Sequence, residues 1–158
     1  MGLSELHMAT ISSDIALAPD VTVALAAIIR AFAAHTGTLH FLGTDGMLHL
    51  AAFHGAIPAP VMEHIRTIAI GKGMAGVCAK LNEPVSWCDL NRDGSGVVQP
   101  AVRSLGLAGS IVVPVRSGAA LVGTLGIANT GERTFTDEET ALLIDCGSSL
   151  VRFRSVSR

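Results

Sequence analysis

Two pairs of strand-like segments, each joined by a short turn, decide the fold class of this chain. The turns are rich in Gly, Asp and Ser, and the flanking segments alternate apolar and polar residues or are almost wholly apolar. Segments joined by turns this short pair antiparallel, because parallel strands need a crossover of a dozen or more residues. Helical patterns precede, separate and follow the pairs, so we predict an α+β fold with an antiparallel sheet. The pairs are 38–42 with 47–54, and 110–115 with 120–128.

Helices are predicted where apolar residues recur at helical spacing. A helix over 20–36 begins at the N-cap Asp20, and a last helix over 136–154 has the capping-box spacing of Thr136 and Glu139. A helix over 58–68, a short helical stretch ending near 81–82, a brief strand over 84–87 and a helical N-terminal segment, 1–19, complete the prediction. The length of 158 residues predicts a single domain, 1–158.

Composition excludes several function classes. The net charge of −2 leaves no basic field for phosphates, so we expect no nucleic-acid partner. The longest apolar run, 21–34, is interrupted by Arg30 and is too short for a membrane span, so we expect no membrane partner. The first residues lack the basic region of a signal peptide, which predicts a cytoplasmic protein.

The three cysteines, Cys78, Cys88 and Cys146, have no CxxC spacing and are expected to be reduced thiols.

Five segments stand in a fixed order along the chain: AAFHG at 51–55, IAIGKGMAGVCAKLNEPV at 68–85, SIVVPV at 110–115, LVGTLGIAN at 121–129, and FTDEETALL at 135–143. Together they resemble the GAF family of small-molecule sensory domains. The resemblance implies a sheet of five or six antiparallel strands. It also implies terminal helices on one face and, on the other, a ligand cavity beneath loops and short helices.

A small-molecule-binding regulatory function follows from the resemblance and from the long polar segment at 88–109. Irregular segments of this length in a compact domain are usually functional, and no complete catalytic constellation accompanies this one. We expect the ligand to be a small polar molecule of unknown identity, and the sequence identifies no cofactor. The candidate ligand contacts are Trp87, Asp89, Arg92, Asp93, Arg103 and Ser110, with His54 at the sheet rim.

A thiol-dependent enzyme is the alternative function. GAF-like free methionine sulfoxide reductases place cysteines in a GVCG turn and in a GHIACD-type segment. Here the turn reads GKGMAG, with Ala75 near the expected cysteine, and Cys78 follows three residues later. No segment resembling GHIACD follows. Cys78 and Cys88 are the residues that such an enzyme would use.

Metal binding is considered at two places and predicted at neither. Residues 89–94 begin like a calcium loop, but the twelfth position is Pro100 instead of a bidentate Glu. A two- or four-residue hairpin turn would place His40 and His49 on one sheet face, which supplies two ligands and no third.

Self-association as a homodimer is expected from the last helix, whose apolar residues cannot all face one sheet. Either a second copy covers the surplus through the terminal helices, or the N-terminal helix covers it within one chain. A helix seam between copies favours a two-fold dimer, and we expect Leu150 to be a candidate contact. The apolar residues are Leu142, Leu143, Ile144, Cys146, Leu150, Val151 and Phe153.

Overall fold

A six-stranded antiparallel sheet forms the centre of the computed structural model, which describes residues 5–87 and 106–154. The strand order is β3-β2-β1-β6-β5-β4, so the two predicted hairpins lie side by side through the β1–β6 pair. The α+β fold with an antiparallel sheet is confirmed. The strands are β1 (Thr36–Leu42), β2 (Met47–His54), β3 (Thr67–Ala69), β4 (Val85–Trp87), β5 (Ser110–Ser117) and β6 (Ala120–Ala128).

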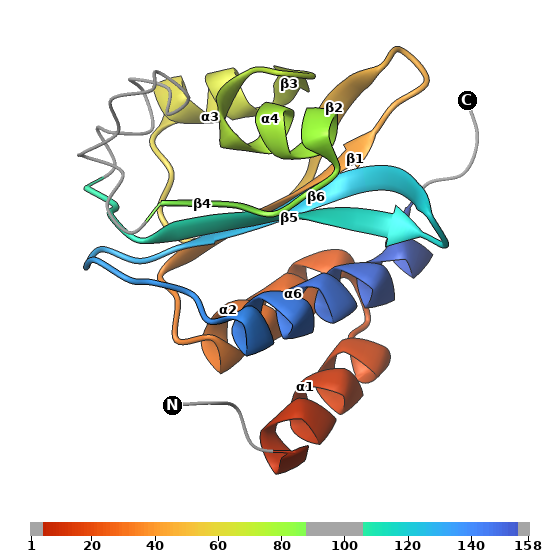
Figure 1. Ribbon diagram of the computed structural model, residues 1–158, viewed down its shortest axis with the longest axis vertical. Coiled ribbons are helices and arrows are strands. Elements are labelled where there is room, and N and C mark those ends of the chain that lie inside the picture. Colours follow the sequence, from red (N-terminus) through yellow and green to blue (C-terminus); the bar gives the residue numbers. More distant parts are fainter. Residues whose placement is uncertain (1–4, 88–105, 155–158) are drawn as a thin grey trace.

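The helices divide between the two faces of the sheet (Figure 1). One face carries α2 (Val21–Ala31) and α6 (Asp137–Ser149), with α1 (Glu5–Leu17) packed against both and the 3-10 helix η2 (Leu150–Phe153) continuing α6. The other face carries the short helices α3 (Ala59–Ile65) and α4 (Gly73–Leu81). Within the described ranges, no helix has the length and apolar character that a membrane crossing requires.

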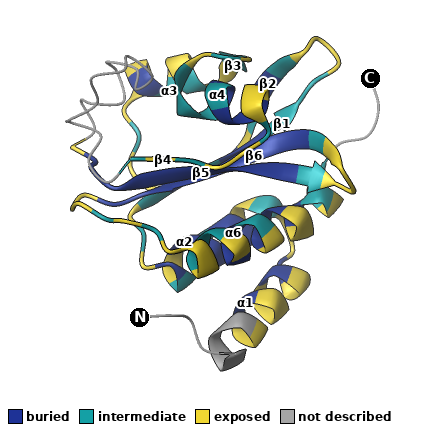
Figure 2. Ribbon diagram, in the orientation of Figure 1, coloured by how far each residue is buried: buried dark blue, intermediate teal, exposed yellow. Residues whose placement is uncertain are grey.

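The main hydrophobic core lies between the sheet and the terminal helices (Figure 2). Alternate strand residues such as Leu39, Val113 and Leu125 are fully buried there against α2 and α6, while Ile11 and Ile15 of α1 close its outer side. Successive strand residues point to opposite faces, so the residues between these core positions face α3 and α4.

Helix starts agree with the predicted caps. The Asp20 carboxylate accepts a hydrogen bond from the Val23 N–H at 2.9 Å. Thr136 and Glu139 form the predicted capping box, in which each side chain accepts from the other residue's backbone N–H at 3.0 Å. Each cap satisfies backbone donors that the first turn leaves open.

The predicted helix over 58–68 is too long. Helix α3 ends at Ile65, and Thr67–Ala69 form the edge strand β3, which pairs with Met47–His49 of β2. The open edge of β2 offers hydrogen bonds to these residues, and this long-range pairing outweighs the local helical pattern. The predicted strand over 84–87 is confirmed as β4.

The register of the first hairpin contradicts the expected pairing of His40 and His49. The Gly43 N–H donates to the Met47 carbonyl oxygen at 2.8 Å, and Leu42 pairs with Leu48 rather than with Met47. Phe41 therefore lies opposite His49, and His40 lies opposite Leu50. Since adjacent strand positions face opposite sides, His40 and His49 lie on different faces of the sheet. His49 pairs with Asp45 at 2.9 Å instead.

The surplus apolar surface of the last helix is largely covered within the chain. Leu150 has no exposed surface, so it is not available to a partner, and α1 packs against α6. The Arg152 guanidinium ties η2 to α1 by donating to the carbonyl oxygens of Ile15 at 2.8 Å and Ala18 at 3.1 Å. The described contacts therefore match the second alternative, a cover supplied by the N-terminal helix.

Candidate functional site

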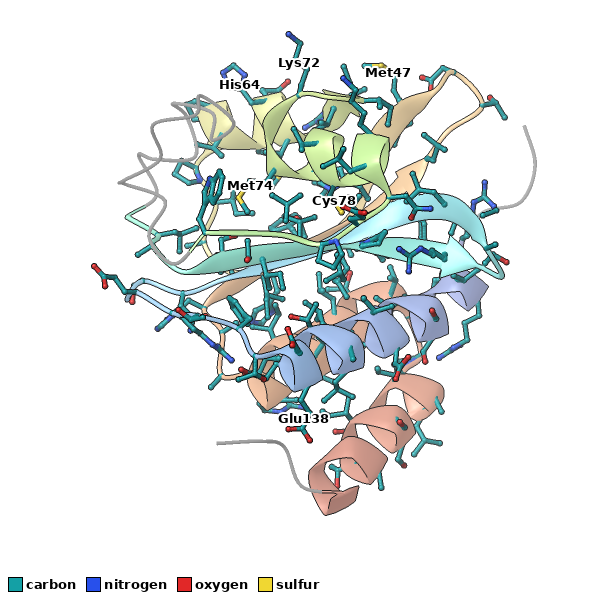
Figure 3. The ribbon with its side chains drawn as sticks, in the orientation of Figure 1. Met47, His64, Lys72, Met74, Cys78 and Glu138 are labelled. Atoms are coloured by element: carbon teal, nitrogen blue, oxygen red, sulfur yellow. The ribbon has the colours of Figure 1, made fainter. Side chains whose placement is uncertain are left out.

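A cavity of about 390 Å³ lies between the sheet and the short helices α3 and α4. Figure 3 shows Met74 between these helices and the sheet, with His64 and Lys72 on the outer side of the helices. The cavity is lined by residues of every strand except β4: Thr36, Gly37, Thr38, His40, Met47, Thr67, Ile68, Ala69, Ser110, Val112, Gly126, Ile127 and Ala128. Ile57, Val61, His64, Ile65, Lys72, Gly73, Met74, Ala75 and Leu107 complete the lining.

Small residues at the centre of the sheet make room for the cavity. Thr38 lies opposite Gly126, and Gly126 lies opposite Val112 on the next strand. A Cβ at Gly126 would lie 3.2 Å from Val112 Cγ2 and 3.6 Å from Thr38 Oγ1. Because Gly126 has no side chain, a hollow remains where β1, β6 and β5 meet. The Thr38 hydroxyl group and the Val112 methyl group border this hollow.

The start of α4 forms part of the opposite wall. Gly73, Met74 and Ala75 line the cavity, and Gly73 adopts φ +63°, a conformation that favours glycine. The first N–H groups of a helix carry partial positive charge. The Lys72 side chain is exposed on the outer side of the helices, away from the sheet.

His40 is the most buried ionisable side chain of the cavity wall, with 2% of its surface exposed. Its Nε2 lies 2.7 Å from the Ile65 carbonyl oxygen, and its Nδ1 has no hydrogen-bond partner within the described residues. Burial lowers the pKa of the imidazole below its ordinary value of 6.5, so His40 is neutral at pH 7.

Two predicted ligand contacts, Trp87 and Ser110, lie opposite each other on β4 and β5. Ser110 lines the cavity, and its hydroxyl donates to the Ile127 carbonyl oxygen at 3.2 Å. Trp87 packs with the lining residues Met74, Leu107 and Ala128. Its indole N–H has no partner among the described residues. The structure thus brings Trp87 and Ser110 together beside the cavity.

His54 lies elsewhere. It pairs with Gly37, at which an added Cβ would collide with the Ile29 side chain of α2. Opposite residues of an antiparallel pair share a face, so the His54 side chain lies on the side of the sheet that α2 and α6 cover, away from the cavity. The other predicted contacts, Asp89, Arg92, Asp93 and Arg103, lie outside the described residues, as does Cys88, and their roles stay predictions.

The two described thiols are unsuited to nucleophilic chemistry. Burial raises the pKa of Cys78 to about 12, although the nearby Arg116 charge acts in the opposite direction. Burial and the Asp145 charge together raise the pKa of Cys146 to about 12. A thiol reacts as its thiolate, so both are inert at neutral pH. The part of the chain that the structure describes also holds no group of three or more His, Cys, Asp or Glu residues placed to bind a metal ion.

The cavity residues of β1 were not predicted from the sequence. Leu39 and Phe41 alternate with His40, and both pack in the core on the terminal-helix side. The same alternation assigns Thr36, Thr38 and His40 to the other face, where a hydroxyl-rich row without large apolar side chains indicates a hollow. That pattern was the available signal.

Solved structures with this fold include GAF domains and enzymes. The GAF domain of a phosphoenolpyruvate-protein phosphotransferase from Coxiella burnetii is 20% identical, with a TM-score of 0.75 over 93% of this chain and 89% of that chain. The free methionine-R-sulfoxide reductase from Neisseria meningitidis is also 20% identical, with a TM-score of 0.75 over 97% of this chain and 93% of that chain. The reduced enzyme from Staphylococcus aureus is 18% identical, with a TM-score of 0.70 over 97% and 96%. These likenesses show a shared fold.

A comparison with curated proteins finds no significant match. The family model described as "GAF domain" matches residues 21–148. This range contains all six strands and both cavity helices. The expected resemblance is therefore confirmed, and this chain belongs to the GAF domain family.

Proposed function

We propose that this protein is a sensory or regulatory GAF domain that binds a small molecule between its sheet and helices α3 and α4. The observation that carries the proposal is the cavity of about 390 Å³, whose largely apolar wall holds a few convergent polar groups, among them Thr38, His40 and Ser110. Size and lining of this kind are typical of small-ligand sites. The ligand is unidentified, and its expected size is that of a metabolite.

Ligand binding would reach the terminal helices through the sheet. Val112 lines the cavity on one face of β5, while its neighbour Val113 is buried in the core on the other face, which α6 covers. Closely packed cores transmit small displacements, so a ligand that favours one arrangement of β5 would bias the packing of α6. Amide hydrogen exchange with and without ligand would test this route, which predicts changed protection in α6.

The thiol-enzyme alternative has less support. Several of the similar solved structures are free methionine-R-sulfoxide reductases, and the Neisseria meningitidis enzyme is in complex with its substrate. In this chain, however, Cys78 is fully buried and its pKa is raised to about 12. We expect no turnover of free methionine sulfoxide with a thiol reductant. Turnover that disappears in Cys88→Ser would establish the enzyme instead.

We also propose a homodimer through the terminal helices. Its support is reduced to exposed apolar residues near the α1–α2 junction, Leu17 with 80% and Val23 with 46% of the surface exposed. Sedimentation at micromolar concentration would test it, with Leu17→Glu expected to shift the mass toward monomer. A strictly monomeric wild type would refute the dimer.

A single domain over 1–158 and a cytoplasmic location stay predictions.

Thermal-shift screening against metabolites, nucleotides and amino acids tests the proposed function. A ligand selective for the native state, at about 100 times its Kd, adds about 2.7 kcal/mol to the free energy of unfolding. For a chain of this size, that corresponds to a rise in Tm of about 5 °C or more. No shift with any compound at millimolar concentration would contradict the proposal.

A further inference from the structure

We infer that His40 determines which ligands the cavity accepts, because its imidazole accepts a hydrogen bond from an O–H or N–H group of the bound molecule. The inference rests on the proposed function, since it concerns the ligand of the same cavity. It assigns the ligand to a chemical class: a small, largely apolar molecule with a hydroxyl, amine or amide donor.

The protein fixes the tautomer of His40. A carbonyl oxygen only accepts hydrogen bonds, so the Nε2 that lies 2.7 Å from the Ile65 oxygen must carry the hydrogen. Burial keeps the ring neutral by lowering its pKa. In a neutral imidazole, one nitrogen donates and the other accepts. Nδ1 of His40 is therefore an acceptor.

This acceptor has no protein partner in the described part of the chain. His40 lines the cavity from β1, has 2% of its surface exposed, and leaves Nδ1 without a hydrogen bond. A buried acceptor without a donor is costly, and native proteins rarely leave one unmet. A donor brought into the cavity would remove this cost.

Thr124, which is not one of the cavity-lining residues, carries a second open polar atom beside His40. It lies directly opposite His40 on β6, on the same face of the sheet, and its buried Oγ1 also lacks a partner among the described residues. Cβ atoms of opposite residues lie about 4.5–5.5 Å apart. Of the two residues, His40 is the one that lines the cavity, so its Nδ1 is the acceptor that a ligand would meet.

The remaining lining completes the ligand description. Ile57, Val61, Ile65, Met74 and Leu107 surround the cavity with apolar surface, which suits a hydrocarbon body. A carboxylate, ether or ketone oxygen facing His40 would set acceptor against acceptor, which is repulsive in a buried site. The donor is therefore the complementary feature of the ligand.

Indole and indene test the inference, because these bicyclic molecules share one shape and only indole has an N–H donor. Their Kd values would be measured by NMR titration for the wild type, His40→Phe and the matched control His49→Phe, whose ring lies on the other face of the sheet. The ratio of the indene Kd to the indole Kd should fall about three- to tenfold in His40→Phe, the value of one net hydrogen bond. It should stay unchanged in His49→Phe.

A second readout uses the wild type alone and does not depend on the folding of a variant. The imidazole ¹⁵N shifts should show a protonated Nε2 and a bare Nδ1, and indole should move the Nδ1 resonance. Three results would overturn the inference while leaving the proposed function standing. They are a ratio of indene Kd to indole Kd in His40→Phe that equals the wild-type ratio, a protonated Nδ1, and an Nδ1 resonance that bound indole does not move. Failure of both probes to bind the wild type would instead count against the cavity as a ligand site.

Discussion

The imidazole of His40 on β1 donates from Nε2 to the Ile65 carbonyl oxygen at the end of α3, at 2.7 Å and across 25 residues of sequence. This hydrogen bond connects α3 to strand β1 of the sheet. Replacing His40 by Phe leaves that carbonyl without its donor, so we predict a loss of about 1–3 kcal/mol in the free energy of unfolding, measured with urea. His49→Phe, at a half-exposed site, should change it by less than about 0.5 kcal/mol. Equal losses would contradict the structural role of this bond.

Acid should reveal the burial of His40. Its folded pKa lies below the ordinary value of 6.5, so between these two values the unfolded chain binds more protons than the folded one. The free energy of unfolding should therefore fall as the pH drops below about 6.5, and this component should stop changing below the folded pKa. Subtracting the curve of His40→Phe isolates the component, because His49 and the carboxylates are present in both proteins. A flat difference between pH 7 and 4 would be inconsistent with a lowered pKa.

Arg133 should be a strong structural residue. It donates to the Phe32 carbonyl oxygen at 2.6 Å, to Asn129 Oδ1 at 3.0 Å and to Glu139 Oε2 at 2.9 Å. Burial alone would raise the pKa of Glu139, but hydrogen bonds from Thr136 and Arg133 outweigh it and hold that pKa below its ordinary value. Arg133→Met should cost about 1–3 kcal/mol in urea denaturation, because it leaves these acceptors open.

The exposed Arg66–Glu63 pair supplies the control for Arg133. Its side chains are 65% and 71% exposed, against 21% and 14% for Arg133 and Glu139. Arg66→Met should therefore change the free energy of unfolding by less than about 0.5 kcal/mol. A similar loss in both variants would mean that burial does not strengthen the Arg133 contacts.

The thiols of Cys78 and Cys146 should resist modification. With a pKa of about 12 for each, only about 10⁻⁴ of either thiol is ionised at pH 8. In a Cys88→Ser variant, Ellman's reagent should therefore find no rapidly reacting thiol in the native protein and two in denaturant. Rapid labelling of Cys78 in the folded state would revive the thiol-enzyme alternative.

Local signals made several elements predictable from the sequence. The side chains of Asp20 and Thr136 satisfy N–H groups within three residues, so the starts of α2 and α6 follow from neighbouring residues alone. Short turns likewise predicted both hairpins. The antiparallel sheet and the fold class followed from these elements.

Long-range contacts explain what the sequence did not predict. The residues Thr67–Ala69 join the edge of β2 because that edge is open, and their own pattern does not encode it. The pairing register of the first hairpin is offset by one residue from the one expected for its four-residue turn, so His49 lies opposite Phe41 instead of His40. The cavity combines residues from two hairpins, two helices and β3. Among the predicted ligand contacts, Ser110 lines it, whereas His40, which also lines it, was not among those predictions. The hydrogen-bond partner of His40 Nε2, the Ile65 carbonyl oxygen, is 25 residues away in the sequence and is identified only by the fold.

The occupation of the cavity is tested most directly by closing it. Ala75 lines the cavity from α4, so Ala75→Phe should fill part of the space, and Ala141→Phe adds the same ring on the exposed side of α6. In a thermal-shift screen, we predict that compounds raising the Tm of the wild type and of Ala141→Phe by about 5 °C leave the Tm of Ala75→Phe unchanged. Equal shifts in all three proteins, or no shift with any compound at millimolar concentration, would contradict a ligand site between the sheet and helices α3 and α4.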